Sequence, residues 1–201
     1  MKRAARTASI ERTTNETSIT LSLALDGQGN HDIDTGIPFF DHMLDAMSRH
    51  GLFDLTLKAQ GDLEVDAHHT VEDVGIVLGK AISQALKDKR GITRFGDALV
   101  PMDEALVLAA IDISGRGQLH WDVELPIEFI GTFETSLMKE FLIALANDAG
   151  LTLHVRKLAG ENAHHIIEAS AKAVARALAT AVAFDPRVGQ RVPSTKGSLA
   201  S

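Results

Sequence analysis

Two adjacent histidine pairs carry the most distinctive chemistry in this sequence. The segment Asp66-Ala67-His68-His69-Thr70-Val71-Glu72 recurs half a chain later as Asn162-Ala163-His164-His165-Ile166-Ile167-Glu168. Helical residues four apart share a face, so the first histidine of each copy can meet the glutamate of that copy. Imidazole and carboxylate donors together suit manganese, zinc or iron. A single pair would more often be a solvated position at a helix start, but the duplicated pattern favours metal sites.

Adjacent helical residues point about 100° apart, which makes two neighbouring imidazoles hard to direct at one ion. We therefore expect His68 and His69 to serve different ions, and likewise His164 and His165. At least two metal sites follow, each mixing ligands from both copies. If the helices of one chain cannot bring these groups together, a neighbouring subunit must supply the rest, which predicts metal-linked oligomers.

Two further positions extend the ligand set. His42 lies in the otherwise apolar segment Phe39-Phe40-Asp41-His42-Met43-Leu44, and Glu140 holds the matching place in the second half of the chain. Alone, His42 would more often be a hydrogen-bonded core histidine and Glu140 a surface carboxylate. Beside the two histidine pairs, both are interpreted as candidate metal ligands.

The elements around each motif also repeat. Apolar residues at three-and-four spacing follow each motif and predict a buried helix, the first ending before Gly91 and the second before Pro186. Each half reads strand, strand, helix, strand, helix. The predicted fold is therefore α+β, with two tandem similar halves whose helices pack between two four-stranded sheets. The predicted strands are 18–25, 54–58, 105–113, 118–124 and 150–155, and the other two predicted helices begin at Pro38 and cover 136–147.

Length and composition set further limits. The 201 residues are interpreted as one domain, 1–201, with a first half of about 1–91, a second half of 92–187 and a C-terminal tail of 188–201. The net charge of −7 argues against wrapping nucleic acid, which requires a basic face. The absence of cysteine excludes disulfides, thiolate metal sites and cysteine nucleophiles. No apolar run is long enough to span a membrane and no secretory signal is recognisable, so a cytoplasmic location is expected.

Four motifs together closely resemble the imidazoleglycerol-phosphate dehydratase family: Phe39–Leu44, Asp66–Asp73, Asn162–Glu168 and Pro193–Gly197. The likeness runs from about Arg6 to Leu199, with the motifs in order. It implies manganese, two ions per active site, and conversion of imidazole glycerol phosphate to imidazole acetol phosphate in histidine biosynthesis. It also implies a homo-oligomer of twenty-four subunits built from trimers, with active sites between subunits.

The resemblance also implies how the ligands divide. One ion would be held by His42, His69, Glu72 and His165, and the other by His68, Glu140, His164 and Glu168. The family often has histidine where this chain has Glu140, and carboxylate can replace imidazole on manganese.

Substrate-binding positions follow from the same resemblance. Glu16 is similar to the family's acid–base carboxylate, while Arg94 and Arg116 are similar to its phosphate-binding arginines. Ser194, Thr195 and Lys196 match the tail that closes over the phosphate. Taken alone, these charges would be ordinary solvated groups, but together they would form a cationic pocket suited to a phosphate dianion. The residues expected to carry the chemistry are Glu16, His42, His68, Glu72, His164 and Glu168.

The mechanism hypothesised from this set is dehydration through a metal-stabilised imidazolate, with Glu16 or a metal-bound water moving the proton. A dinuclear metal phosphoesterase is the alternative, since it could use the same donors with metal-bound hydroxide. A metal-storage or metal-assembled shell without turnover is a third possibility, which would leave the tail and the two arginines without a purpose. Ketone formation without phosphate release would distinguish the dehydratase.

Overall fold

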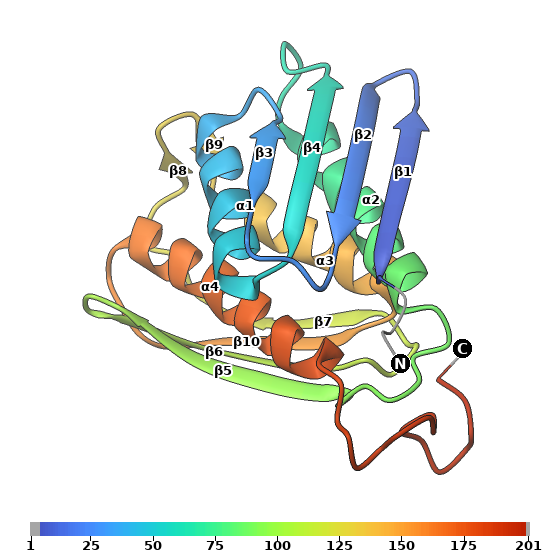
Figure 1. The fold of residues 1–201 in the computed structure, drawn as a ribbon. Coiled ribbons are helices and arrows are strands. Elements are labelled where there is room, and N and C mark those ends of the chain that lie inside the picture. The colour runs from blue at the N-terminus through green and yellow to red at the C-terminus, as the bar shows by residue number, and fades with distance from the viewer. Residues whose placement is uncertain (1–4, 200–201) are drawn as a thin grey trace.

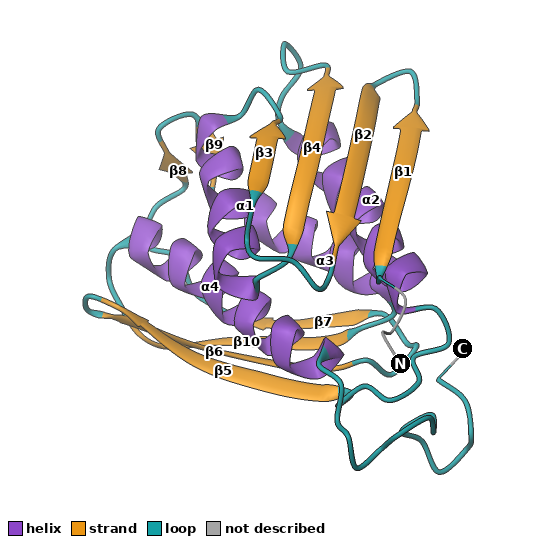
Figure 2. Ribbon diagram, in the orientation of Figure 1, coloured by secondary structure: helices purple, strands orange, loops and turns teal. Residues whose placement is uncertain are grey.

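The computed structural model describes residues 5–199, in which four helices lie between two four-stranded sheets (Figures 1 and 2). The α+β class and the two four-stranded sheets are confirmed. The elements of the first half are β1 (Thr7–Thr13), β2 (Thr17–Ala24), β3 (His31–Asp34), α1 (Pro38–Gly51), β4 (Asp54–Gly61) and α2 (His68–Leu86). Those of the second half are β5 (Phe95–Met102), β6 (Ala105–Asp112), β7 (Gln118–Asp122), β8 (Phe129–Ile130), β9 (Phe133–Glu134), α3 (Leu137–Ala149), β10 (Thr152–Ala159) and α4 (Ala163–Val182).

The two sheets have the same topology. Their strand orders are β1-β2-β4-β3 and β5-β6-β10-β7, and in each sheet the last pair is parallel while the others are antiparallel. The short hairpin β8–β9 has no counterpart in the first half of the described chain. The internal duplication read from the histidine motifs therefore extends over the whole fold.

The short hairpin β8–β9 was not predicted. In the two four-stranded sheets, three strands had no predicted bounds: β1, β3 and β5. The first is an edge strand with a single buried side chain, Ala8, and the second spans only four residues. The third contains Gly96 and Pro101 and does not alternate regularly, so period-two patterning does not reveal it.

The helices pack in two pairs, α1 against α4 and α2 against α3. A Cβ added at Gly75 of α2 would lie 2.6 Å from the backbone oxygen of Phe141 and 2.9 Å from the Cβ of Ala144, so only glycine allows this approach. Strand β6 buries alternate residues against the helices, as expected for a sheet covered on one face. The core thus holds the helix N-termini, where the histidine motifs lie, at fixed positions.

Helix starts fall at or near the motifs. Helix α1 begins at Pro38, as predicted from its fixed φ and missing N–H. At α4 the side chain of Asn162 accepts hydrogen bonds from the backbone N–H groups of His164, at 2.9 Å, and His165, at 3.4 Å. This cap places the second histidine pair on the first turn of the helix. Within residues 5–199, no helix is both long and apolar enough for a bilayer span.

Candidate metal centre

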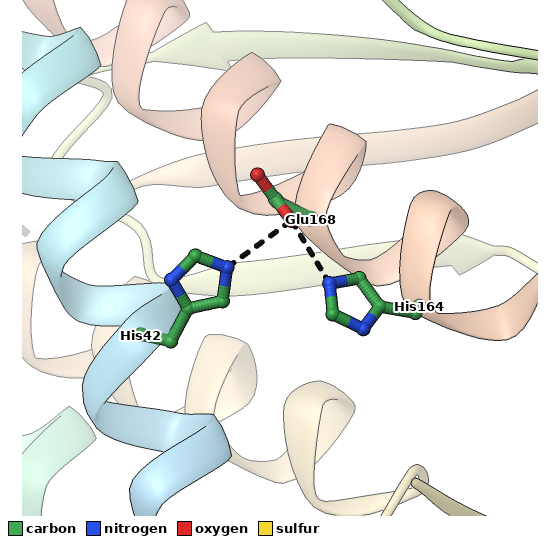
Figure 3. Close-up of side chains that lie close together, drawn as sticks. All are labelled: His42, His164 and Glu168. Carbon is green, nitrogen blue, oxygen red and sulfur yellow. Dashed lines mark hydrogen bonds and ion pairs between the residues drawn. The ribbon is translucent and has the colours of Figure 1, made fainter.

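Three predicted ligands meet where α1 and α4 lie side by side (Figure 3). The Nε2 atom of His42 is 3.2 Å from Oε2 of Glu168, and Nε2 of His164 is 3.1 Å from the same oxygen. The three ligand atoms all lie within 4.8 Å of one another, and no other group of three or more such donors forms within residues 5–199. This spacing suits two imidazole nitrogens and one carboxylate oxygen around a single cation.

Glu168 is the centre of this cluster. Its side chain is only 9% exposed, and its second oxygen, Oε1, is 2.6 Å from Nζ of Lys172. Burial by itself would raise the pKa of Glu168, but Lys172 and His42 outweigh it and hold that pKa below the ordinary value. The carboxylate is therefore ionised, which is the form that binds metal. The donor set fits a first-row divalent ion such as manganese.

The first copy of the motif is more open. His68 and Glu72 are both about half exposed, and Nε2 of His68 is 3.6 Å from Oε2 of Glu72. His69 faces other groups, with Nδ1 3.0 Å from Oδ2 of Asp62 and Nε2 3.9 Å from Oε1 of Glu16. The carboxylate of Asp62 raises the pKa of His69. Within the described residues, His68 and Glu72 have no third donor close enough to form a metal site with them.

His165 turns away from the Glu168 cluster. Its Nδ1 is 2.7 Å from Oε2 of Glu104, and its Nε2 is 3.6 Å from Oδ2 of Asp103. The rings of His164 and His165 are 6.2 Å apart and steeply inclined, as are those of the first pair. Neighbouring histidines thus face different carboxylates, as the helical geometry predicts.

Glu140 lies on the first turn of α3, half buried, with no hydrogen-bond or ion-pair partner within residues 5–199. Its carboxylate is therefore available to a ligand. The structure of one chain groups His42 with His164 and Glu168. It does not bring His42 to His69 or His165, nor Glu140 to His164. The division of ligands implied by the resemblance requires groups from more than one chain and stays a prediction.

The candidate substrate residues are only partly brought together. Arg94 and the tail residues Ser194 and Thr195 line one cavity of about 440 Å³. The guanidinium of Arg94 pairs with both oxygens of Asp112, at 2.7 and 3.0 Å, and its Nη1 donates to the backbone oxygen of Pro193 at 3.0 Å. Arg94 is thus already oriented beside the tail motif.

Three other candidates lie outside that cavity. Glu16 is in the loop between β1 and β2, with 54% of its side chain exposed. Arg116 and Lys196 are also exposed, and neither lines the cavity beside Arg94. One chain therefore does not assemble the cationic pocket predicted from Arg94, Arg116 and Lys196.

Comparison with known proteins identifies the family. A model of the family "Imidazoleglycerol-phosphate dehydratase" matches residues 35–178. The enzyme of that name from Moorella thermoacetica is 61% identical over 96% of this chain and 98% of its own length. That from Dinoroseobacter shibae is 59% identical over 96% of this chain and its full length. The chain belongs to the imidazoleglycerol-phosphate dehydratase family. Membership places it among lyases of histidine biosynthesis.

Solved imidazoleglycerol-phosphate dehydratase structures share the fold. The crystal structure from Staphylococcus aureus superposes with a TM-score of 0.81 at 38% identity, covering 89% of this chain and 99% of that one. The structure from Pyrococcus furiosus, in complex with (S)-C348, gives 0.82 at 40% identity, covering 94% and 99%. The resemblance stated from four motifs is thereby confirmed over nearly the whole chain.

Sequence reasoning missed four charged residues around the candidate site residues: Asp62, Glu104, Asp112 and Lys172. Each contacts a residue that was predicted, namely His69, His165, Arg94 and Glu168 in that order. One signal was available for Glu104, since it directly precedes β6 just as Glu16 directly precedes β2. The other three have no spacing relation that would single them out.

Proposed function

We propose that this chain catalyses the dehydration of imidazole glycerol phosphate to imidazole acetol phosphate, using two manganese ions per active site. The single observation that carries the proposal is the cluster of His42, His164 and Glu168 in a chain of this family. Three nitrogen and oxygen donors face one point, and their carboxylate is ionised and nearly buried. Imidazole and carboxylate donors suit manganese, whereas structural zinc sites are usually rich in thiolates.

His42, His164 and Glu168 would hold one ion together with ligands from another subunit. This grouping differs from the division implied by the resemblance, in which His42 serves the other ion. The remaining candidates, His68, His69, Glu72, Glu140 and His165, would complete the two sites. When bound, the ions would supply Lewis-acid stabilisation of negative charge on the imidazole of the substrate. The protein's own part is to fix the direction of each donor: the first turns of α2 and α4 carry the two histidine pairs, while α1 carries His42 and α3 carries Glu140.

Glu16 is the residue proposed to move the proton. Its carboxylate is exposed and 3.9 Å from Nε2 of His69, so it can reach a substrate held beside that ring. It would take the proton from the carbon next to the one that loses hydroxide. Arg94, already aligned by Asp112, would bind the phosphate with Ser194 and Thr195. Arg116 and Lys196 would approach from elsewhere in the assembly.

The open geometry of the first copy supports an oligomer. His68 and Glu72 are half exposed and lack a third donor within the described chain. Ligands from a neighbouring subunit would complete the site, so manganese binding and assembly would be linked. We propose a homo-oligomer of twenty-four subunits built from trimers.

The test is incubation of the purified chain with manganese and imidazole glycerol phosphate. Ketone formation and phosphate release are followed together, with a chelated sample as the control. We expect ketone without free phosphate, activity that returns when manganese is added back, and a particle that shrinks on chelation. Phosphate release without ketone would instead identify a phosphoesterase. A fully active sample free of transition metal would overturn the proposal.

A further inference from the structure

The duplication gives Glu16 a counterpart, and that counterpart is Glu104. Each residue directly precedes the second strand of its sheet, Glu16 before β2 and Glu104 before β6. Each side chain also faces the second histidine of its half, His69 or His165. The equivalence of position is therefore matched by an equivalence of contact.

The contacts themselves differ in kind. Oε1 of Glu16 is 3.9 Å from Nε2 of His69, too far for a hydrogen bond, and the carboxylate is left free. Oε2 of Glu104 is instead 2.7 Å from Nδ1 of His165. Its other oxygen, Oε1, accepts the backbone N–H groups of Asn162 at 2.9 Å and Glu161 at 3.2 Å. Glu104 is thus fixed by three hydrogen bonds between the β5–β6 turn and the start of α4.

In the first half, the Nδ1 contact is made by a different residue. Asp62 directly follows β4, and its Oδ2 is 3.0 Å from Nδ1 of His69. In the second half, Gly160 directly follows β10 and provides no carboxylate. The two halves therefore satisfy the same ring nitrogen by different routes. Asp62 holds His69 and leaves Glu16 free, whereas Glu104 must hold His165 itself.

We propose that Glu104 is a positioning residue for the metal centre, which fixes His165 with the proton on Nδ1 and presents its Nε2 to manganese. The inference rests on the proposed function, in which His165 is a ligand. Oε1 of Glu104 accepts hydrogen bonds from two backbone N–H groups, and Oε2 lies 2.7 Å from Nδ1 of His165, so both carboxylate oxygens are placed as acceptors. The facing Nδ1 must then be the donor, and in the neutral ring Nε2 is left with the lone pair.

The first measurement is made on the parent chain, and a variant serves only to assign the signals. The full chain is labelled with ¹³C,¹⁵N-histidine, stripped of metal and studied by magic-angle-spinning NMR at a pH where the rings are neutral. The His165 signals are assigned by their loss in His165→Gln. We expect the Nδ1–H tautomer at His165. An Nε2–H tautomer there would overturn the proposal, whatever any variant does.

The second measurement compares Glu104→Gln with Glu161→Gln. Both changes remove one negative charge at the start of α4, but the Glu161 side chain makes no hydrogen bond within residues 5–199. In Glu104→Gln the amide can donate to Nδ1 and shift the proton to Nε2. We expect a change of tautomer and roughly 10–100-fold weaker manganese binding, followed by EPR of free Mn²⁺. The control variant should match the parent chain in both.

The tautomer and the manganese affinity of Glu104→Gln decide whether Glu104 acts on the metal centre through His165. Unchanged tautomer and manganese affinity in a folded Glu104→Gln chain would refute the role. Melting temperatures of the metal-free variants show whether weakened hydrogen bonds from the backbone of Glu161 and Asn162, rather than the changed His165 ring, account for weaker manganese binding. A parent chain that binds manganese and shows the Nδ1–H tautomer, but forms no ketone, would sink the proposed function while supporting Glu104.

Discussion

The two copies of the histidine motif share two histidines and a glutamate at the same spacing but have different surroundings. In the second copy, Glu168 is nearly buried, contacts two imidazoles and pairs with Lys172. In the first copy, Glu72 is half exposed and stands 3.6 Å from one imidazole. The equivalent of Lys172 four residues after Glu72 is Ile76, so the first carboxylate has no such partner. Duplication has therefore produced one preorganised part-site and one that depends on further ligands.

The loop carboxylates diverge in the same way. Glu104 is committed to His165 and to the start of α4, whereas Glu16 is free because Asp62 holds His69. The comparison teaches that an internal repeat can keep donor positions constant while it fixes the loop carboxylate in one half and leaves it free in the other. The experiments that follow test this division, from the largest expected effect to the smallest.

Glu16→Gln should give the largest effect. Removal of a positioned general base or acid lowers turnover by roughly 10²–10⁴-fold. Because Glu16 makes no hydrogen bond to His69, manganese affinity and particle size should stay at the parent values. Steady-state kinetics of ketone formation give the turnover, and EPR and light scattering give the other two. Turnover close to that of the parent chain would remove Glu16 from the mechanism.

Glu168→Gln and Glu72→Gln sharpen the contrast between the copies. Both should lose manganese, because each removes a proposed ligand. Only Glu168→Gln should also destabilise the metal-free chain, by about 3 kcal/mol, since it leaves Lys172 partly buried without its carboxylate. Glu72→Gln should change that stability by less than about 0.5 kcal/mol, as for an exposed residue.

Calorimetry of the metal-free proteins separates the two variants. Equal melting temperatures for Glu168→Gln and Glu72→Gln would show that the burial of Glu168 has no energetic consequence. The claim that the second copy is preorganised would then be wrong.

Much of this arrangement was visible in the sequence. The repeated motif predicted the duplication, and three-and-four spacing predicted the helices, because a buried helical face has one clear period. The strands β1, β3 and β5 were missed for a physical reason. Edge strands bury few side chains, and so their sequences carry little alternation. The pairing of His42 with Glu168 depends on how α1 packs on α4, and no local pattern encodes that packing.

Charged partners of the site were harder to predict. Glu104 and Asp62 act through loop geometry that only the folded chain displays. Lys172 lies on α4 four residues after Glu168, a spacing that also describes any ordinary surface pair. Sequence therefore identified the candidate donors, while the distinction between a closed and an open copy required the structure.

Gly75→Ala tests whether the two helix pairs pack equally closely. Gly75 lies seven residues after the first histidine of its motif, and Ala171 holds the same place in α4. A Cβ at Gly75 would meet the backbone oxygen of Phe141 at 2.6 Å, so α2 and α3 must separate. We expect a loss of about 1–3 kcal/mol in the metal-free chain.

The matched change is Ala171→Gly, which only removes a methyl group and adds backbone freedom. It should cost about 1 kcal/mol. Urea unfolding of both variants, followed by circular dichroism, gives the comparison. A Gly75→Ala chain as stable as the parent would mean that α2 and α3 tolerate separation, contrary to the tight contact.

The smallest effect concerns two titratable groups at the far ends of these helix pairs. Burial raises the pKa of Asp148 on α3 above its ordinary 3.8. Burial, with the charges of Lys172 and Arg176, lowers the pKa of His50 on α1 below 6.5. In both cases the folded chain disfavours the charged form. Stability should therefore fall as pH rises from 3.8 through the raised pKa of Asp148, and fall as pH drops from 6.5 through the lowered pKa of His50.

Each variant should remove one side of this profile. Asp148→Asn should flatten the metal-free melting temperature just above about pH 4, and His50→Gln should flatten it just below about pH 6.5. Neither variant should change the opposite side. If either variant flattened both sides, the two helix pairs would be titrating as one unit. The α1–α4 and α2–α3 pairs, each of which joins one helix from each half, would then not contribute independently to the stability of the chain.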